Sequence, residues 1–335
     1  MASKTGKGDA ATSVPLKTAG PFDLSLFIAR YGTIFALLIL VVAFAIGSEN
    51  FLTSKNIINV MRQVSVLTVI AAGITIAVAS GEFDLSLGQI ASLSMILVAG
   101  LIVRQEQSTF VAIVVAVAAG AIFGILNGLL VTRARIPSLI CTIGTGAIAV
   151  GVNYAYAKGD SIYGRIPASF SFIGQGFVGP VPFSVILSLI IWAILYFFLN
   201  HTRSGRYIVA TGGNPTAARL SGVKISKYRM IGLFLSASCA AIGGIMLASY
   251  LGAAQPTGGD SYTMNCLAVV FLGMTTIKPG QSNMLGTLIG VVFMGVLNNG
   301  LNLMGAPFYA QNIIRGTVLI LAVIMAVSRE EIRLM

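Results

Sequence analysis

Acidic side chains that could do chemistry are scarce in this 335-residue sequence, which holds 10 Asp and Glu against 21 Lys and Arg. Glu82 and Asp84 are the only acids in the apolar stretch between Arg62 and Arg104. A carboxylate that faces lipid near the middle of a membrane costs at least about 2.5 kcal/mol, so both acids are expected at the membrane boundary or facing protein and water. Two roles stay open for them: Asp84 or Ser86 caps the helix that follows, or Asp84 lines a polar pathway or gate.

Side chains for the common catalytic and metal-binding arrangements are missing from the sequence. His201, the single histidine, lies beside the basic loop. We therefore expect neither a catalytic His triad nor a multi-His metal site. Cys141, Cys239 and Cys266 lie in apolar stretches without paired spacing, and we interpret them as small buried hydrophobic residues. No Gly-x-x-x-x-Gly-Lys-[Ser/Thr] loop is present to hold nucleotide phosphates. We therefore predict that the chain binds no cofactor or metal and is not an enzyme.

Uncharged amides form the third group of candidate functional residues. Amides suit a neutral polyhydroxylated solute because they offer hydrogen bonds without holding the solute by charge. The alternative is that they link neighbouring helices, at about 0.6 kcal/mol for each hydrogen bond. Together with Glu82, Asp84 and Ser86, the candidates for a gate or pathway are Gln255, Asn298, Asn299 and Asn302.

The composition places all these residues in a membrane protein. Hydrophobic residues make up 56% of the chain, charged residues 9%, and the mean hydropathy is +0.91. Soluble domains usually carry about 25% charged residues. The net charge of +11 does not indicate nucleic-acid binding, because the basic residues lie between apolar spans rather than on one polar domain.

Apolar stretches predict an all-α, polytopic transmembrane bundle with about ten spans. Fifteen of the 21 Lys and Arg fall on one side, so the positive-inside rule places both termini in the cytoplasm. We divide the chain into a cytoplasmic tail (1–30), a membrane domain (31–328) with a cytoplasmic loop (201–229), and a C-terminal tail (329–335). The expected spans are 31–47, 62–80, 86–103, 109–132, 138–157, 182–200, 230–251, 262–275, 285–304 and 311–328.

An internal similarity points to a repeat. The stretch 123–130 (FGILNGLL) resembles the stretch 293–301 (FMGVLNNGL), and the predicted topology gives the two spans opposite directions. An inverted five-plus-five repeat produces this pattern. Chance similarity between helices rich in Gly and Leu explains it equally well.

The basic loop 201–229 contains a short helix signal. Asn214 is a good N-cap and Pro215 suits the first helical position. Gly222 can adopt the left-handed conformation that ends a helix. We predict about two helical turns outside the membrane, a form suited to transmitting force from a cytoplasmic partner. The alternative is a basic loop that only fixes orientation against anionic lipid headgroups.

Four motifs in this order resemble bacterial sugar permeases related to the ribose importer. They are the stretches 81–88 (GEFDLSLG), 210–223 (ATGGNPTAARLSGV), 254–257 (AQPT) and 286–303, and the likeness spans roughly residues 50–328. Glu82 departs from the family, which usually has Gly there, and residues 275–280 depart from its loop rich in Gly and Ser. The resemblance implies that the segment around the short helix contacts an ATPase, through Arg206, Gly213, Asn214, Pro215, Ala217, Ala218, Arg219, Gly222 and Lys224.

The resemblance also implies the partners of the chain. These are a second permease subunit (in a homo- or heterodimer), cytoplasmic ATPase subunits that bind ATP-Mg, and an external solute-binding protein, with membrane lipid around the bundle. We therefore expect the permease subunit of an ATP-driven importer for a monosaccharide or similar small polyhydroxylated solute. The alternative is an ion-coupled secondary transporter, which the scarcity of intramembrane acids disfavours.

Overall fold

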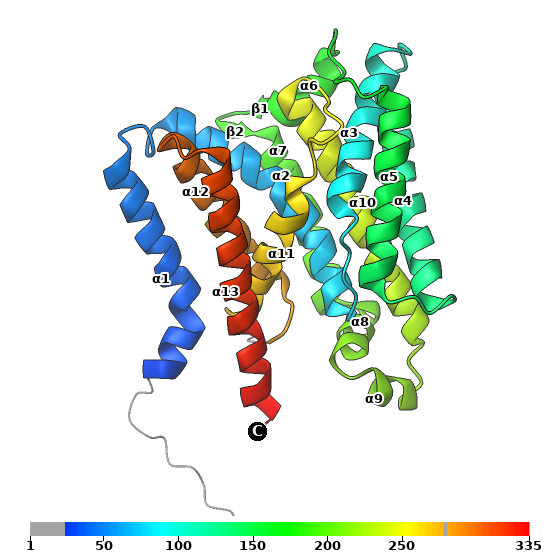
Figure 1. Cartoon of the computed structure of the whole chain (residues 1–335), viewed down its shortest axis with the longest axis vertical. Coiled ribbons are helices and arrows are strands. Elements are labelled where there is room, and N and C mark those ends of the chain that lie inside the picture. The colour runs from blue at the N-terminus through cyan, green and yellow to red at the C-terminus, as the bar shows by residue number, and fades with distance from the viewer. Residues whose placement is uncertain (1–23, 278–279, 335) are drawn as a thin grey trace, which may run out of the picture.

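The computed structural model describes residues 24–277 and 280–334, which form an all-helical bundle with one small β-hairpin (Figure 1). The thirteen helices of these residues include every predicted span. Their bounds, with those of the two strands, are α1 Leu24–Gly47, α2 Ser54–Ala79, α3 Leu87–Val103, α4 Thr109–Thr132, α5 Ser138–Ala157, α6 Ala168–Gln175, β1 Phe177–Val178, β2 Val181–Pro182, α7 Phe183–His201, α8 Arg203–Gly213, α9 Pro215–Leu220, α10 Ile225–Leu251, α11 Ser261–Met274, α12 Met284–Leu303 and α13 Phe308–Leu334.

Seven helices of the described chain are long and apolar enough to cross a membrane, namely α2, α4, α5, α7, α10, α12 and α13. Three further apolar helical segments are shorter: 32–47 of α1, α3 and α11. The polytopic helical bundle is confirmed. Two helices run beyond their predicted apolar spans, α1 from Leu24 and α13 to Leu334. In α13 the polar residues that follow the apolar stretch continue the helix, because good helix formers such as Glu and Arg need no lipid to do so.

The middle of the bundle is formed by α2 and α10, which cross at close range. Most of the α2 and α10 side chains are buried, whereas α4, α5 and α7 expose rows of Ile, Leu, Val and Phe, as lipid-facing helices do. Gly73 of α2 makes the close approach possible, since a Cβ there would lie 2.5 Å from the Cβ atom of Cys239 in α10. The closely packed pair α2 and α10 thus forms a rigid centre that supports the polar linkers at the ends of the helices.

The packing is reciprocal between the two halves of the chain. Helix α10 lies against α3 and α4, while α2 lies against α11 and α12. In the first half, Asn127 of α4 accepts a hydrogen bond from Thr145 of α5 (2.6 Å). At the matching place in the second half, Asn298 of α12 accepts one from Arg315 of α13 (2.7 Å). This correspondence favours the inverted repeat over chance similarity.

The stretch between α5 and α7 contains the short helix α6 and the β1–β2 hairpin. Helix α6 packs against α10, where a Cβ on Gly174 would meet the backbone of Tyr250 at 2.3 Å. Ser249 ties the two helices, because its hydroxyl donates to the Phe170 carbonyl and accepts from Gly174 N–H (2.8 Å). The β1–β2 hairpin follows and leads into α7.

At the other end of the bundle lie α8 and α9, together with the start of α1 and the C-terminal end of α13 (Figure 1). The α6 segment and the hairpin are at the opposite end. On the α9 side, the one tryptophan of the sequence, Trp192 in α7, donates from its indole nitrogen to the Met284 carbonyl at the start of α12 (3.2 Å). The start of α1, the end of α13 and the basic α8–α9 segment thus lie at the same end of the bundle.

Candidate functional site

The predicted short helix is present as α9, and the backbone caps it as its sequence indicates. The side chain of Asn214 accepts from Ala217 N–H (2.9 Å), and Pro215 is at the first turn. Gly222 has φ +81°, the left-handed conformation that favours glycine after a helix. Ala218 is buried, whereas Ala217 and Arg219 are exposed at the end of the bundle. Helix α9 is thus a rigid projection with a free outer face.

A second helix in the same segment, α8, was missed by the sequence analysis, which treated everything before Asn214 as loop. Thr202 caps α8 by accepting from Gly205 N–H (3.1 Å), and this cap was the available signal. At its other end, Gly212 lies directly on the linker 80–86 between α2 and α3. A Cβ on Gly212 would be 2.3 Å from the Ala79 carbonyl oxygen. The end of α8 therefore contacts the linker that carries both candidate acids, Glu82 and Asp84.

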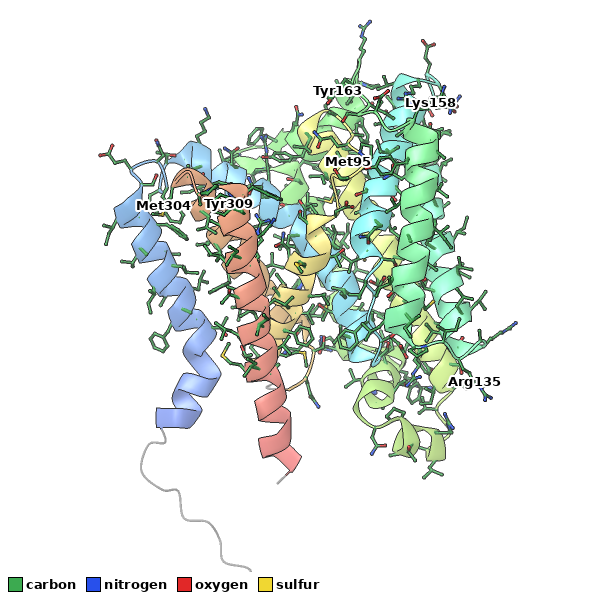
Figure 2. All side chains as sticks on the ribbon, viewed as in Figure 1. Met95, Arg135, Lys158, Tyr163, Met304 and Tyr309 are labelled. Atoms are coloured by element: carbon green, nitrogen blue, oxygen red, sulfur yellow. The ribbon has the colours of Figure 1, made fainter. Side chains whose placement is uncertain are left out.

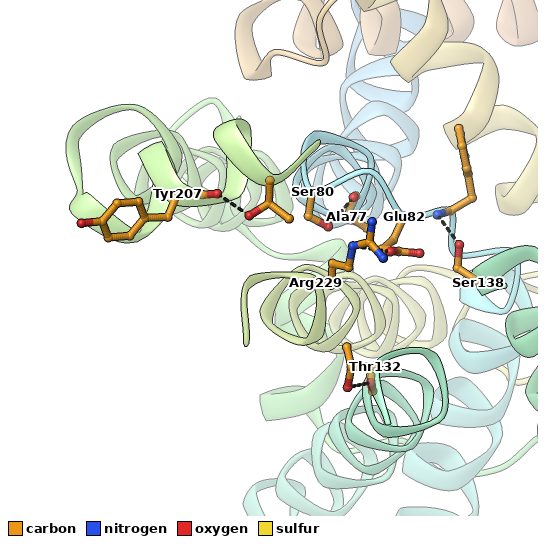
Figure 3. A network of polar contacts seen from close by, with 10 residues as sticks. Ala77, Ser80, Glu82, Thr132, Ser138, Tyr207 and Arg229 are labelled. Carbon is orange, nitrogen blue, oxygen red and sulfur yellow. Dashed lines mark hydrogen bonds and ion pairs between the residues drawn. The ribbon is translucent and has the colours of Figure 1, made fainter. Parts of the chain in front are cut away.

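The linker 80–86 is also held by α10, through the one ion pair found in the described chain. The Nε atom of Arg229, in the first turns of α10, lies 3.0 Å from a carboxylate oxygen of Glu82 (Figure 3). The Glu82 side chain is 6% exposed and that of Arg229 is 33% exposed. Glu82 therefore lies at the end of the bundle and faces protein, as predicted. The linker is contacted by α8 on one side and by α10 on the other.

We expect the ion pair to support stability. Replacing Glu82 by glutamine leaves Arg229 without its counter-ion beside other cations, which costs about 1–3 kcal/mol because Arg229 is partly exposed. Purified Glu82→Gln protein is therefore expected to unfold at a lower temperature than the wild type. The double variant Glu82→Gln/Arg229→Gln should recover part of that loss, and strictly additive losses would show that the two side chains are uncoupled.

Asp84, the second acid of the linker, faces protein and has no exposed surface. It accepts from both the backbone N–H (3.0 Å) and the hydroxyl of Ser86. Burial raises the pKa of the Asp84 carboxyl, and the hydrogen bonds from Ser86 oppose that rise. Ser86 occupies the N-cap position of α3 but makes no side-chain capping bond, so its hydroxyl serves Asp84 instead. The capping role predicted for Ser86 is therefore wrong for its side chain.

From Asp84 a polar chain continues into the membrane domain. Asn127 of α4 donates to the Ser86 hydroxyl (3.1 Å) and accepts from Thr145 of α5. Two further residues of α5 bind the linker backbone, because Ser138 accepts from Phe83 N–H (3.2 Å) and Thr142 accepts from Leu85 N–H (3.1 Å). The linker therefore joins the α8–α9 segment to helices α4 and α5.

A cavity of about 880 Å³ opens beside the ion pair at the α9 end of the bundle. Four cations and one acid are among its lining residues, namely Arg135, Arg219, Lys224, Arg229 and Glu82. Arg135 lies in the loop between α4 and α5 (Figure 2). The net positive charge of this cavity suits contact with an acidic surface.

The amide candidates do not gather with Asp84. Asn299 makes a reciprocal pair with Asn56 of α2 (2.9 and 2.8 Å), so it links two helices, as the alternative interpretation required. Gln255 is exposed, in the linker between α10 and α11. Only Asn298 and Asn302 share a cavity, of about 250 Å³, at the end away from α9. Its other lining residues are Gln63, Leu67, Tyr250, Ser261, Tyr262, Asn265, Gly295 and Arg315.

No grouping that could hold a metal ion occurs within residues 24–277 and 280–334, where no three His, Cys, Asp or Glu side chains come together. His201 stacks on Phe197 at the end of α7, with ring centroids 5.3 Å apart. The three cysteines are buried and free.

The chain combines long apolar helices with a polar linker, which is joined to an exposed end segment, and with polar cavities at both ends. These features define a polytopic membrane protein of the transport class. Residues 56–323 match the family described as branched-chain amino acid transport system / permease component, and the chain belongs to this family.

Among curated proteins, the chain is 36% identical over 296 residues to the ribose import permease protein RbsC of Escherichia coli (strain K12), covering 88% of this chain and 92% of that protein. It is 37% identical over 297 residues to the protein of the same name in Bacillus subtilis (strain 168), with the same coverages. The D-allose transport system permease protein AlsC of Escherichia coli (strain K12) is 33% identical over 304 residues, or 90% of this chain and 93% of that protein.

Proposed function

We propose that the chain is the permease subunit of an ATP-driven importer that moves a neutral monosaccharide across a bacterial inner membrane. The relatives named for ribose and allose support the substrate class. Family membership supports separate ATPase subunits that hold ATP-Mg, an external solute-binding protein and a second permease subunit. With α9 in the cytoplasm, the start of α1 and the C-terminal end of α13 lie on the cytoplasmic side as well.

One observation carries the mechanism: the segment α8–α9 and the first turns of α10 hold the linker 80–86 from two sides. In the proposed cycle, the ATPases bind α9 through its exposed residues and through the cationic cavity beside it. Their closure on ATP moves α8 and α10, and the linker transmits the shift to α4 and α5 through the hydrogen bonds of Ser138, Thr142 and Asn127. ATP acts because it favours one of the two permease states.

Reconstitution tests the energy source. Proteoliposomes that hold the chain with its ATPase are expected to accumulate ribose or allose when ATP and the solute-binding protein are supplied. Vesicles with the chain alone are expected to accumulate neither sugar under a proton or sodium gradient. Uptake by the chain alone under such a gradient would establish the ion-coupled alternative and overturn the proposal.

The proposed orientation predicts which side of the membrane reaches α9. A cysteine at Arg219, which is exposed in α9, is expected to react with a membrane-impermeant maleimide only in inside-out vesicles. A cysteine at Lys158, at the opposite end of the bundle (Figure 2), is the matched control and is expected to react only in right-side-out cells. The native cysteines are buried and give little background. The reverse pattern of labelling would rule out cytoplasmic docking on α9.

A further inference from the structure

The 250 Å³ cavity at the end away from α9 is built from parts of five helices and is strongly polar. Gln63 comes from α2, Tyr250 from α10, Asn265 from α11, Asn298 from α12 and Arg315 from α13. Met304 and Tyr309, which follow α12 and begin α13, mark this end of the bundle in Figure 2. The cavity thus lies where α11, α12 and α13 of the second half meet the central helices.

One side chain lining the cavity has an unmet hydrogen bond. Asn265 is 6% exposed, and its carboxamide oxygen has no hydrogen-bond partner within the described residues. A buried acceptor without a partner costs free energy, so such atoms are rare unless a ligand or water completes them. Because Asn265 lines the cavity, we expect a ligand in the cavity to donate a hydrogen bond to its carboxamide oxygen.

Arg315 is the one charged group among the lining residues, and it is already held by neutral partners. Its Nε donates to the Asn298 oxygen (2.7 Å) and a terminal nitrogen donates to the Gln311 oxygen (3.0 Å). Gln311 in turn donates to the Asn302 oxygen (2.9 Å). This chain fixes the guanidinium between carboxamides and places no carboxylate in the cavity, so cationic ligands are disfavoured.

We propose that this cavity is a binding site for a neutral monosaccharide on its way through the permease, with Asn265 and Arg315 as specificity-determining residues. A sugar hydroxyl both donates and accepts, so one ligand class can complete the Asn265 oxygen and also accept from Arg315. The volume is just below the usual range for ligand sites, about 300–1,000 Å³, and it suits a monosaccharide better than a disaccharide. This inference rests on the proposed sugar transport.

Protection from labelling tests binding directly. A cysteine replacing Ser261, which is exposed and lines the cavity, is labelled in the full-length chain with a small thiosulfonate reagent. D-ribose, D-allose and L-arabinose are tested at tens of millimolar, each against sodium gluconate. At twice its dissociation constant a bound sugar is expected to slow labelling about threefold, because only the empty third reacts. A cysteine replacing Ser169, exposed in α6 at the same end, controls for effects of sugar on the reagent.

Uptake by the complete importer tests whether the site is used. Asn265→Leu keeps the side-chain size and removes the acceptor, and it is expected to slow sugar uptake about tenfold. ATP hydrolysis stimulated by the sugar-loaded binding protein is expected to stay within about twofold, because α9 and its linker are untouched. Asn200→Leu removes an exposed amide at the far end of α7 and serves as the control.

The outcomes separate the two proposals. No sugar uptake by the wild-type complex overturns the proposed function itself. Wild-type uptake with unchanged uptake by Asn265→Leu, or with no protection at Ser261→Cys by any sugar, overturns only the cavity assignment. Protection by gluconate and not by the neutral sugars would show a site for anions and reject the stated ligand class.

Discussion

Gly212→Ala is expected to uncouple ATP hydrolysis from uptake almost completely. The added Cβ would lie 2.3 Å from the Ala79 carbonyl oxygen and 2.8 Å from the Gly81 amide nitrogen. Both are backbone atoms, so α8 itself has to move away from the linker. Overpacking of this kind costs about 1–3 kcal/mol, and if the whole amount falls on the coupled state, uptake drops about 5- to 150-fold.

The measurement compares ATP hydrolysis with sugar uptake in the same proteoliposomes. Hydrolysis is expected to persist, because the exposed face of α9 is unchanged and still binds the ATPase. Gly144→Ala is the matched control, since it adds the same methyl group in α5 where nothing lies within 4 Å. If Gly212→Ala transported at the wild-type rate with wild-type thermal stability, the contact between α8 and the linker would have no part in coupling.

The second large effect is expected at Asp84, where two substitutions separate a structural role from a gating role. Asp84→Asn keeps the size and one acceptor oxygen for Ser86, so the protein is expected to fold and insert normally. Asp84→Ala leaves the buried Ser86 donors unmet and is expected to lower stability by about 1–3 kcal/mol. Thermal unfolding of the purified variants measures this difference.

Uptake then decides between the two roles. If the Asp84 charge takes part in gating, Asp84→Asn is expected to slow uptake about tenfold at normal protein levels, since hydrogen bonds to a charged group are worth more than those to a neutral one. Ser184→Ala in α7 is the control for a buried packing change, because Ser184 is buried without a hydrogen-bond partner in the described chain and is not among the groups that bind Asp84. Normal uptake by a correctly inserted Asp84→Asn protein would leave Asp84 a structural role only.

Sequence patterns predicted those elements whose signals are local. The ten apolar stretches each became a helix, and α9 has the cap and the left-handed glycine that Asn214 and Gly222 indicate. Helix α8 escaped prediction because Gly205, Gly212 and Gly213 lower its helix propensity. Its stability comes from packing on α2, α7 and α10. Tertiary packing, and not local helix propensity, therefore determines that residues 203–213 form a helix.

The positions of the polar side chains were the hardest to predict. Asp84 could be placed near the membrane boundary from its charge, but its complete burial depends on Ser86 and on Asn127, 43 residues further along the chain. Asn298 and Asn299 are adjacent in sequence, yet one lines a cavity and the other pairs with Asn56. Their separation follows from the helix, in which neighbours point about 100° apart. Asn265 gave no signal in the sequence beyond being an amide in a span.

The indole of Trp192 gives the protein a fluorescent reporter that needs no engineering. It is the sole tryptophan of the chain, and its hydrogen bond to Met284 crosses from α7 to the start of α12, close to the end where the ATPase is proposed to act. Any rearrangement that separates these two helices breaks that bond and changes the polarity around the ring. Emission from the importer reconstituted with its partners can therefore follow the switch between states in real time, once signals from partner proteins are subtracted.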